Sequence, residues 1–353
     1  MTDDWEFLGP RVCMVSPWPP ARDGIARFAE PLALAASRTR EVRRIGIPEG
    51  GGEQRRALHT GLRALKLVVD ARGFDDLLVQ YHPHYYMRGA WASRVASYVS
   101  WALLVRLRPV SFVVHELDDP RPEELGRRGR LQFRVEEGVR RFFWKRATRI
   151  VFLSAWQRDR FVARYPVGPR RVLQLATHGA LFSPAAEGSS ADARRELGIE
   201  AGRVLLLMIG FISPSKPDKG YDRALRALDV AADRRVDLHI VGSPIREHPE
   251  VDALLRSLRA AAASSPQVHL HERWLTDQEF DRWLLAADAV LLPYREAASS
   301  GVAARARMLG TRIVASGSGG LGEQLGDRDI VVASDDELVA AIRRVSRDAV
   351  VAG

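Results

Sequence analysis

Apolar residues in this chain gather in short continuous runs, separated by stretches with the spacing of amphipathic helices. The runs predict strands at 11–16, 76–80, 110–114, 149–153, 172–175, 204–209, 237–241, 267–270, 289–292, 312–315 and 330–332. The helical patterns lie at 24–38, 90–107, 130–147, 222–234, 249–263, 277–287 and 336–346. Unbroken apolar runs are typical of parallel strands covered by helices on both faces. The chain is therefore predicted to be an α/β protein with doubly wound parallel sheets.

The alternation of strands and helices occurs in both halves of the chain, which are divided by a segment rich in alanine, serine and glycine at 183–200. We expect an N-terminal Rossmann-like domain over 1–185, a linker over 186–200 and a C-terminal Rossmann-like domain over 201–353. Such sheets bind ligands at the carboxyl ends of their strands. Two of these domains facing each other would hold a ligand in a central cleft.

The composition is that of an ordinary globular protein, with 353 residues of which 46% are hydrophobic. One cysteine, Cys13, excludes an internal disulfide framework. The first residues, MTDDWEFLGP, lack the basic and apolar regions of a signal peptide. No uncharged run reaches the about 18 residues that span a bilayer. We therefore expect a cytoplasmic protein.

The formal net charge is +9, and the densest basic segment is RRFFWKR at 140–146. Interleaved basic and aromatic residues suit a peripheral contact with the inner face of a membrane. An ordinary helix with a basic outer face explains the segment more simply. No nucleic-acid-binding motif is present in the sequence, so we expect no nucleic-acid partner.

The segment 205–228, LLLMIGFISPSKPDKGYDRALRAL, has the pattern of an anion-binding turn. Its apolar run ends at Gly210, a polar loop with Ser213 and two lysines follows, and Gly220 begins an amphipathic helix. The free N–H groups at a helix start and the positive end of its dipole favour a phosphate, and a lysine adds a point charge. This loop predicts a phosphate site at the start of the second domain.

Three other loops follow predicted strands of the first half. Gly24 precedes a helix, where a glycine either permits close approach of a ligand or simply forms a tight turn. His115 ends a strand and would point toward a ligand, although an isolated histidine is often only structural. The loop with His82, His84 and Tyr85 suits a carbohydrate or another polar ring. No third ligand at metal spacing accompanies these histidines, so we expect no metal site there.

The segment GSGGLG at 317–322 fits the dinucleotide-binding fingerprint by its letters. Too few residues follow it to build the rest of a dinucleotide-binding sheet. We expect instead a glycine-rich backbone turn beside a phosphate.

Taken in order, these segments resemble the retaining family 4 glycosyltransferases of the GT-B fold, also called glycosyl transferases group 1. The resemblance runs nearly end to end. It is carried by SPWPPARDGIARFAEPLA, VVHEL at 113–117, RIVFLSAWQRDRF, THGALFSP at 177–184, MIGFISPSKPDKGYDRALRAL, LHIVGSP, HERWLTDQEFDRWLLAADAVLLPYRE, SSGVAARARMLGTRIVAS and GGLGEQL.

This resemblance implies transfer of a sugar from a nucleoside diphosphate sugar to a hydroxyl acceptor, with retention at the anomeric carbon. It implies no cofactor and no obligatory metal, because a basic pair in the diphosphate loop neutralises the leaving group. The family's arginine of that pair falls on Ser213 here, and its lysine falls on Lys219 or Lys216.

The resemblance also assigns the candidate residues. The expected catalytic set is His115, Lys216, Lys219 and Glu296. The expected donor and phosphate set is Gly24, Gly210, Ser213, Gly220, Ser300, Gly301, Val302 and Arg305, where the backbone N–H groups of 300–302 would cradle phosphate. The expected acceptor set, on the N-terminal domain, is His82, His84 and Tyr85.

Two positions depart from the family pattern. The family has two glutamates eight positions apart; Glu296 is near the first, although strict spacing falls on Ala297, and the second falls on Arg305. An arginine cannot accept hydrogen bonds from ribose hydroxyls. Three readings follow: a transferase, a glycosyltransferase-like binding partner without transfer activity, or a transferase whose donor carries an atypical phosphate that pairs with Arg305.

Overall fold

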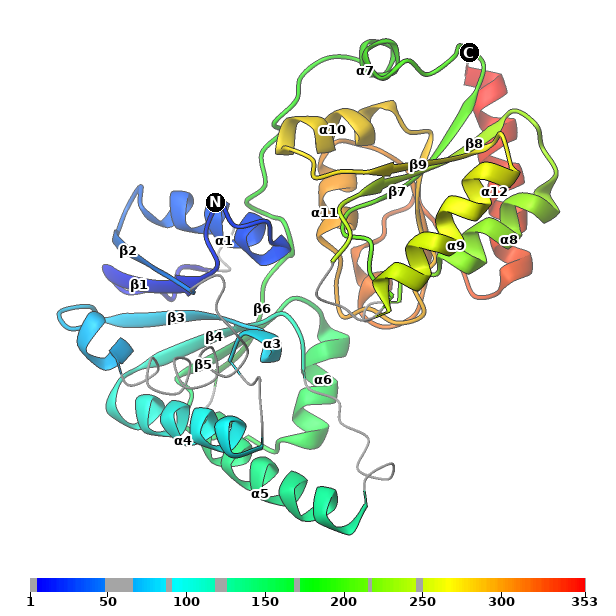
Figure 1. The fold of residues 1–353 in the computed structure, drawn as a ribbon. Coiled ribbons are helices and arrows are strands. Elements are labelled where there is room, and N and C mark those ends of the chain that lie inside the picture. The colour runs from blue at the N-terminus through cyan, green and yellow to red at the C-terminus, as the bar shows by residue number, and fades with distance from the viewer. Residues whose placement is uncertain are drawn as a thin grey trace. The chain divides into compact units, whose positions relative to one another are not determined.

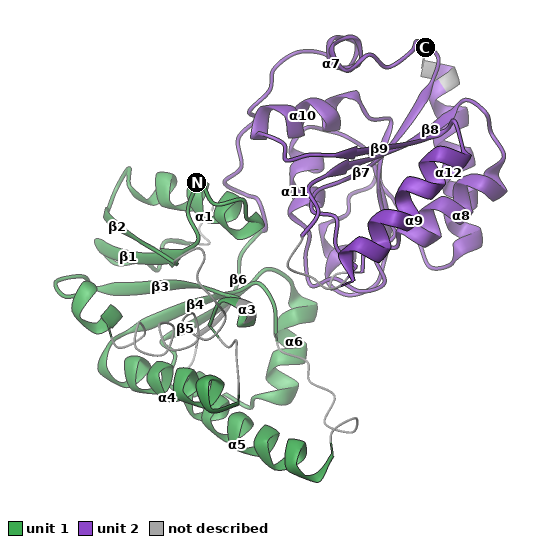
Figure 2. Ribbon diagram, viewed as in Figure 1, with its two compact units in different colours: residues 1–177 green, residues 178–353 purple. Residues whose placement is uncertain are grey.

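The computed structural model describes residues 5–47, 66–86, 91–117, 126–167, 172–214, 218–245 and 250–352. The chain forms two compact units, residues 1–177 and 178–353 (Figure 2). Each unit is built on its own parallel sheet.

Unit 1 contains a six-stranded sheet in the order β2-β1-β3-β4-β5-β6, with every recorded pairing parallel (Figure 1). The strands are β1 (Arg11–Ser16), β2 (Glu41–Gly46), β3 (Asp76–Tyr81), β4 (Val110–Val114), β5 (Arg149–Phe152) and β6 (Val172–Leu175). The described helices are α1 (Gly24–Ala36), α3 (Pro83–Tyr86), α4 (Trp91–Leu107), α5 (Arg127–Trp144) and α6 (Ala155–Arg164). Trp101 of α4, Phe143 of α5 and Phe161 of α6 share one buried core with the strands.

Unit 2 contains a second six-stranded parallel sheet in the order β12-β11-β10-β7-β8-β9. Its strands are β7 (Val204–Ile209), β8 (Val236–Gly242), β9 (Val268–Glu272), β10 (Ala289–Leu292), β11 (Ile313–Ser316) and β12 (Ile330–Val332). Its helices are α7 (Ser190–Leu197), α8 (Tyr221–Ala231), α9 (Val251–Ser264), α10 (Asp277–Ala286), α11 (Gly301–Met308) and α12 (Asp335–Ala352), with a short 3₁₀ helix η3 (Leu321–Gln324).

Strand β7 shows why these strands read as unbroken apolar runs. Leu206 and Met208 lie in a core with α8, α9 and α12, whereas Leu205 and Leu207 lie in a second core with α10 and α11. Because successive side chains point to opposite faces, a strand covered on both faces needs apolar residues throughout. The predicted α/β class with two doubly wound parallel sheets is confirmed.

The boundary between the units differs from the sequence-based expectation of a linker at 186–200. That stretch contains α7, which begins with a capping box at Ser189 and ends at Gly198 with φ +69°. The Arg194 side chain donates to the Ala286 carbonyl oxygen over 3.0 Å, which fastens α7 to α10. A composition rich in alanine and serine therefore marks a helix of unit 2 here.

Candidate functional site

The turn after β7 in unit 2 is shaped by two close glycines. A Cβ atom added to Gly242 would lie 1.7 Å from the Gly210 carbonyl oxygen, so only glycine fits at 242. A Cβ added to Gly210, where φ is +112°, would lie 3.2 Å from Lys219 Nζ and 3.6 Å from Val302 Cγ2. The Lys219 ammonium therefore lies over this turn, close to the first turn of α11.

The neighbours of Lys219 fix its backbone. At Gly220, where φ is +67°, a Cβ would lie 2.3 Å from the Pro293 carbonyl oxygen, so a side chain is excluded. The Gly220 N–H donates to Asp218 Oδ1 over 3.0 Å, and Arg295 Nε donates to the other oxygen of Asp218 over 2.8 Å. These contacts tie the loop to the segment after β10.

Lys219 itself is partly buried, and within the described ranges it forms no ion pair or side-chain hydrogen bond. Burial lowers the pKa of Lys219 from 10.5 to about 8. The ammonium is still mostly charged at neutral pH. An unpaired, partly desolvated cation attracts an anion more strongly than a solvated one.

The amino end of α11 adds backbone donors to this region. Ser300 caps the helix, since its Oγ accepts from the Ala303 N–H over 3.3 Å. The Ser300 N–H donates to Gln324 Oε1 over 2.6 Å. That N–H is therefore engaged within the protein, in contrast to the expectation that it cradles phosphate. The N–H groups of Gly301 and Val302 belong to the first helical turn, where no intrahelical acceptor exists.

His178 lies beside this helix end. A Cβ on Gly301 would be 3.5 Å from His178 Nε2. Burial lowers the pKa of His178 to about 4, so its imidazole is neutral at pH 7. The sequence-based prediction did not include His178, although the THGALFSP segment that contains it carried part of the resemblance.

Arg305 does not have the environment expected of a phosphate ligand. It is 8% exposed, and its guanidinium pairs with the fully buried Asp281 and, over 3.4 Å, with Asp277. Its cation is therefore neutralised inside unit 2. The ion pair satisfies the charge of Arg305 within the protein, and the reading in which Arg305 binds an atypical phosphate on the donor stays a prediction.

The segment before α11 is held by the glycine-rich turn at 317–322. Ala297 is buried and forms a β-bridge with Gly319, and the Gly320 N–H donates to the Ala297 carbonyl oxygen over 2.8 Å. A Cβ on Gly319 would lie 2.3 Å from that same oxygen. These glycines thus allow two backbone segments to approach closely.

Three further predicted residues lie around this region. Glu296 is exposed. Ser213 is 7% exposed in the loop after β7, and Lys216 lies outside the described residues.

In unit 1, the loops after β1 and β3 meet at Asp23. This residue caps α1, where Oδ1 accepts from the Ile25 N–H over 2.6 Å. The Tyr85 hydroxyl donates to Oδ2 of Asp23. A Cβ on Gly24 would meet nothing within 4 Å, which leaves open space over the helix start.

The loops after β3 and β4 meet through two histidines. His82 Nε2 lies 2.9 Å from Glu116 Oε2, and its ring centroid is 5.2 Å from that of Tyr85. His115 Nε2 lies 2.6 Å from Gln80 Oε1, and the ring packs edge-on against Phe28. The side chain of His84 lies outside the described residues.

The structure therefore gathers the predicted residues of unit 1 at the carboxyl ends of β1, β3 and β4. Asp23, Gln80 and Glu116, which hold them, were missed by sequence reasoning. Asp23 carried a usable signal, because an aspartate before an apolar helical pattern is a typical N-cap. The sequence carried no signal for Gln80 and Glu116 as partners of the two histidines, because these contacts depend on which strands pair.

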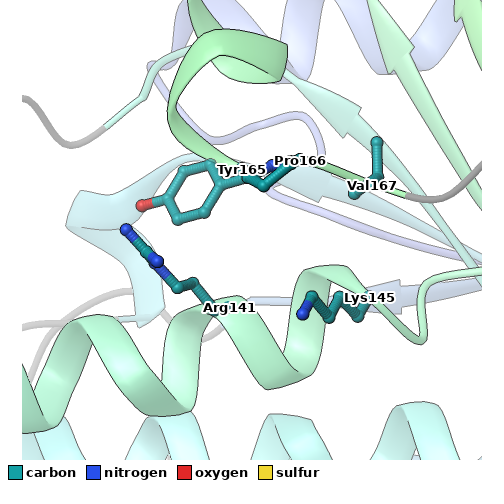
Figure 3. A pocket seen from close by; sticks show the side chains of 5 residues that line it. All are labelled: Arg141, Lys145, Tyr165, Pro166 and Val167. Carbon is teal, nitrogen blue, oxygen red and sulfur yellow. The ribbon is translucent and has the colours of Figure 1, made fainter.

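The basic segment 140–146 is only partly a surface. Arg140, Phe143 and Trp144 are buried, and Arg140 is hydrogen-bonded to Tyr98. Arg141 of α5 and Lys145, the residue that caps this helix, line a small pocket with Tyr165, Pro166 and Val167 (Figure 3). None of the helices among the described residues has the length and apolar character to cross a membrane.

Residues 203–348 match the family model described as Glycosyl transferases group 1. The chain is 29% identical over 285 residues to a D-inositol 3-phosphate glycosyltransferase of Geodermatophilus obscurus, a match covering 75% of this chain and 58% of that protein. It is 27% identical to the protein of the same name from Frankia alni, over 72% of this chain and 60% of that protein. The chain thus spans about three fifths of the length of these relatives.

Two solved structures have a similar fold. One is sucrose-phosphate synthase from Thermosynechococcus elongatus, with a TM-score of 0.67, 15% identity, and coverage of 96% of this chain and 90% of that one. The other is Alr3699/HepE of Anabaena in complex with UDP and glucose, with a TM-score of 0.65, 16% identity and the same coverage. At this level of identity the likeness concerns the fold alone.

Proposed function

We propose that this chain, in which residues 203–348 match Glycosyl transferases group 1 and whose fold is similar to that of GT-B structures, transfers a sugar from a nucleoside diphosphate sugar to a hydroxyl acceptor. In this proposal the sugar keeps its anomeric configuration and no obligatory metal takes part. Unit 2 would bind the donor and unit 1 the acceptor.

The observation that carries the proposal is the position of Lys219. Its ammonium lies over the Gly210 turn and next to Val302 at the amino end of α11. When the bond between sugar and phosphate breaks, negative charge grows on the leaving diphosphate. A fixed cation and the N–H groups of Gly301 and Val302 would stabilise that charge without reorganising. Ser213 replaces the family's arginine and could add only a hydroxyl hydrogen bond.

We assign the remaining steps to both units. The reaction would be a front-face substitution through an oxocarbenium-like state, in which the leaving phosphate takes the acceptor's proton. His115 would contact the donor sugar, and the pairs Asp23–Tyr85 and His82–Glu116 would position the acceptor. Gly24, with open space above it, permits a close approach of either substrate.

A panel of nucleoside diphosphate sugars tests this proposal by calorimetry and by mass spectrometry of the products. We expect one donor to bind and its sugar to be transferred. Lys219→Ala should lower kcat/KM about 10²- to 10³-fold, the range for removing one group that stabilises developing charge. Lys145→Ala, on the exposed face of α5, is the matched control and should change it less than twofold.

A second candidate is a glycosyltransferase-like protein that binds its ligand without transferring a sugar. The presence of serine at 213 and of the ion-paired Arg305 at the family's ribose position favours it. Donor binding without product, or no binding to any donor by folded protein, would replace the enzymatic proposal with this one.

We also propose that unit 1 contacts the anionic inner face of a membrane through the outer surfaces of α4 and α5. The exposed cations of α5 with Lys145 are Arg127, Arg128, Arg130, Arg134 and Arg141, whereas both glutamates of the helix are buried. The outer side of α4 exposes Val99, Leu103 and Leu107. Apolar side chains beside cations suit a lipid interface.

Co-sedimentation with vesicles tests this contact. The protein should sediment with phosphatidylglycerol vesicles and not with phosphatidylcholine vesicles. Arg128→Glu with Arg134→Glu should abolish sedimentation, while Arg234→Glu with Arg256→Glu in unit 2 should not. Equal sedimentation of both double variants would contradict the proposed surface.

A further inference from the structure

Strands β8 and β9 of unit 2 carry a group of histidines that the proposed function does not use. The strands pair with His239 opposite His269 and Val241 opposite His271. Because alternate residues of a strand share a face, His269 and His271 lie on the same side of the sheet as His239. The rings of His239 and His271 both pack against Trp283 of α10, so this is the side of the sheet that faces α10.

The nitrogen atoms of these rings are close together. His239 Nδ1 lies 3.1 Å from His271 Nε2, and the rings of His239 and His269 stack with centroids 4.3 Å apart. The ligand atoms of Asp237, His239 and His269 all lie within 4.8 Å of one another. A tetrahedral ion with metal–nitrogen distances of 2.0–2.1 Å needs nitrogens about 3.3 Å apart, which modest ring rotations would provide.

We propose that His239, His269 and His271 bind a divalent transition metal ion of the class that prefers imidazole ligands, such as Zn²⁺, Ni²⁺, Cu²⁺ or Co²⁺. Two histidines separated by one residue on a strand, with a third opposite on the next strand, place three imidazoles on one face of the sheet. Three histidines with an open fourth position are an established zinc ligand set.

The surroundings agree with this assignment. His239 is buried and His271 is partly buried beside it, and the neutral form of an imidazole is the one that binds metals. His269 is 39% exposed in its side chain, which gives an ion a route from solvent. Asp237 Oδ1 lies 3.7 Å from His269 Nε2 and is itself ion-paired to Arg203, so it would orient His269 from behind.

The site would fasten the edge of the sheet. Strand β9 lies at one edge of the sheet of unit 2, where it pairs with β8. A metal ion shared between the two strands would add a cross-link on the face that α10 covers. This role is independent of sugar transfer, since none of the three histidines belongs to the proposed donor or acceptor residues.

Titration of the tag-free full chain with CoCl₂ and ZnSO₄ tests the proposal. We expect one ion per chain, absorption bands of tetrahedral Co²⁺, and a melting temperature that rises with zinc concentration. Cu²⁺ should quench Trp283 fluorescence, because the indole lies 5.0 Å from the His271 ring, and Trp283→Phe should remove that quenching.

The decisive variant is His269→Gln with His271→Gln on the edge strand. It should lower zinc affinity at least 100-fold while circular dichroism shows an unchanged fold. His82→Gln in unit 1 is the control and should bind zinc as the unaltered chain does. Single His269→Gln, at the exposed position, keeps the test interpretable if the double variant unfolds, and it should lose at least tenfold. Zinc binding weaker than millimolar in the unaltered chain, or equal binding by the His269 and His82 variants, would overturn the proposal.

Discussion

The strand-end loops of the two units hold their polar groups in different ways. In unit 2, Lys219 and the amino end of α11 are placed by glycines at which no side chain fits, and the lysine has no ion pair among the described residues. In unit 1, the polar side chains are paired with one another, as in Asp23–Tyr85 and His82–Glu116. Backbone N–H groups and one cation are suited to binding a phosphate, a group that all nucleoside diphosphate sugars share. Paired side chains are suited to recognising the shape and hydroxyl pattern of one particular acceptor.

Within unit 2, a second contrast separates ligand charges from structural charges. Lys219 has no ion-pair partner in the part of the chain that the structure describes, whereas Arg305 is a buried cation that pairs with two carboxylates. A buried carboxylate left without its cation costs several kcal/mol, whereas an unpaired lysine contributes little to folding. Substitutions at the two positions should therefore separate stability from ligand binding.

The largest loss of stability is expected where Gly210 and Gly242 of unit 2 lie in contact. Gly242→Ala places a methyl group 1.7 Å from the Gly210 carbonyl oxygen, and neither backbone can move without breaking the turn. We expect the free energy of unfolding to fall by more than about 4 kcal/mol, the exceptional range for one substitution. Urea denaturation measures it.

Gly24→Ala is the matched change in unit 1, since its methyl group meets nothing within 4 Å. It should leave the free energy of unfolding within about 0.5 kcal/mol while raising the KM of a substrate that approaches Gly24. Similar destabilisation by both alanines would remove the contrast between the two regions.

Arg305→Met should destabilise the chain by about 3–5 kcal/mol, because Asp281 would remain as a fully buried charge without its cation. Arg307→Met, on the exposed side of the same helix, should cost less than about 0.5 kcal/mol. Urea denaturation of these variants, and calorimetry with the nucleoside diphosphate sugar that the donor panel identifies, separate the two roles. Unchanged stability with lost donor binding would place Arg305 in the ligand site.

A smaller effect is expected at the paired side chains of unit 1. Asp23→Ala removes the cap of α1 and the acceptor of the Tyr85 hydroxyl, and should cost about 1 kcal/mol. Asp23→Asn keeps one oxygen to cap the helix and places its NH2 group where the Tyr85 hydroxyl can accept from it, so it should be nearly as stable as the unaltered chain. If the pair serves the acceptor, alanine should raise the acceptor KM and leave the donor KM unchanged. A change in the donor KM alone would contradict this assignment.

Much of the fold could be predicted because buried parallel strands have an obvious pattern. The sequence runs at 204–209 and 237–241 contain the apolar residues that both faces require, and both are strands. Strand β2 was not predicted, because EVRRIG is an edge strand with three exposed charged residues and no apolar run. Helix α11 was indicated by the family resemblance and not by periodicity, because its eight residues are too few for a clear pattern.

Residues of the candidate sites could be predicted only where the local sequence pattern indicates a single structural role. The glycines and Lys219 could be placed from the strand-loop-helix pattern, since phosphate binding needs those features in that order. Arg305 and Asp281 are 24 positions apart in the sequence and lie on different helices, so no sequence spacing predicts that they form an ion pair. The histidines of β8 and β9 share a site only through strand register, which the sequence alone does not fix.

The last prediction concerns pH and separates Lys219 from every paired cation in the chain. Because burial lowers the pKa of Lys219 to about 8, the free protein loses this charge as pH rises through 8. The affinity for the proposed nucleoside diphosphate donor should therefore fall above pH 8, by up to tenfold per pH unit, until the pKa of the complex is reached. The free energy of unfolding should instead rise between pH 8 and about 10.5, since the unfolded lysine still binds its proton there. Lys219→Arg should bind that donor equally from pH 7 to 9.5, because a guanidinium stays charged. Calorimetry at matched ionic strength measures both proteins, and parallel pH profiles would show that another group carries the dependence.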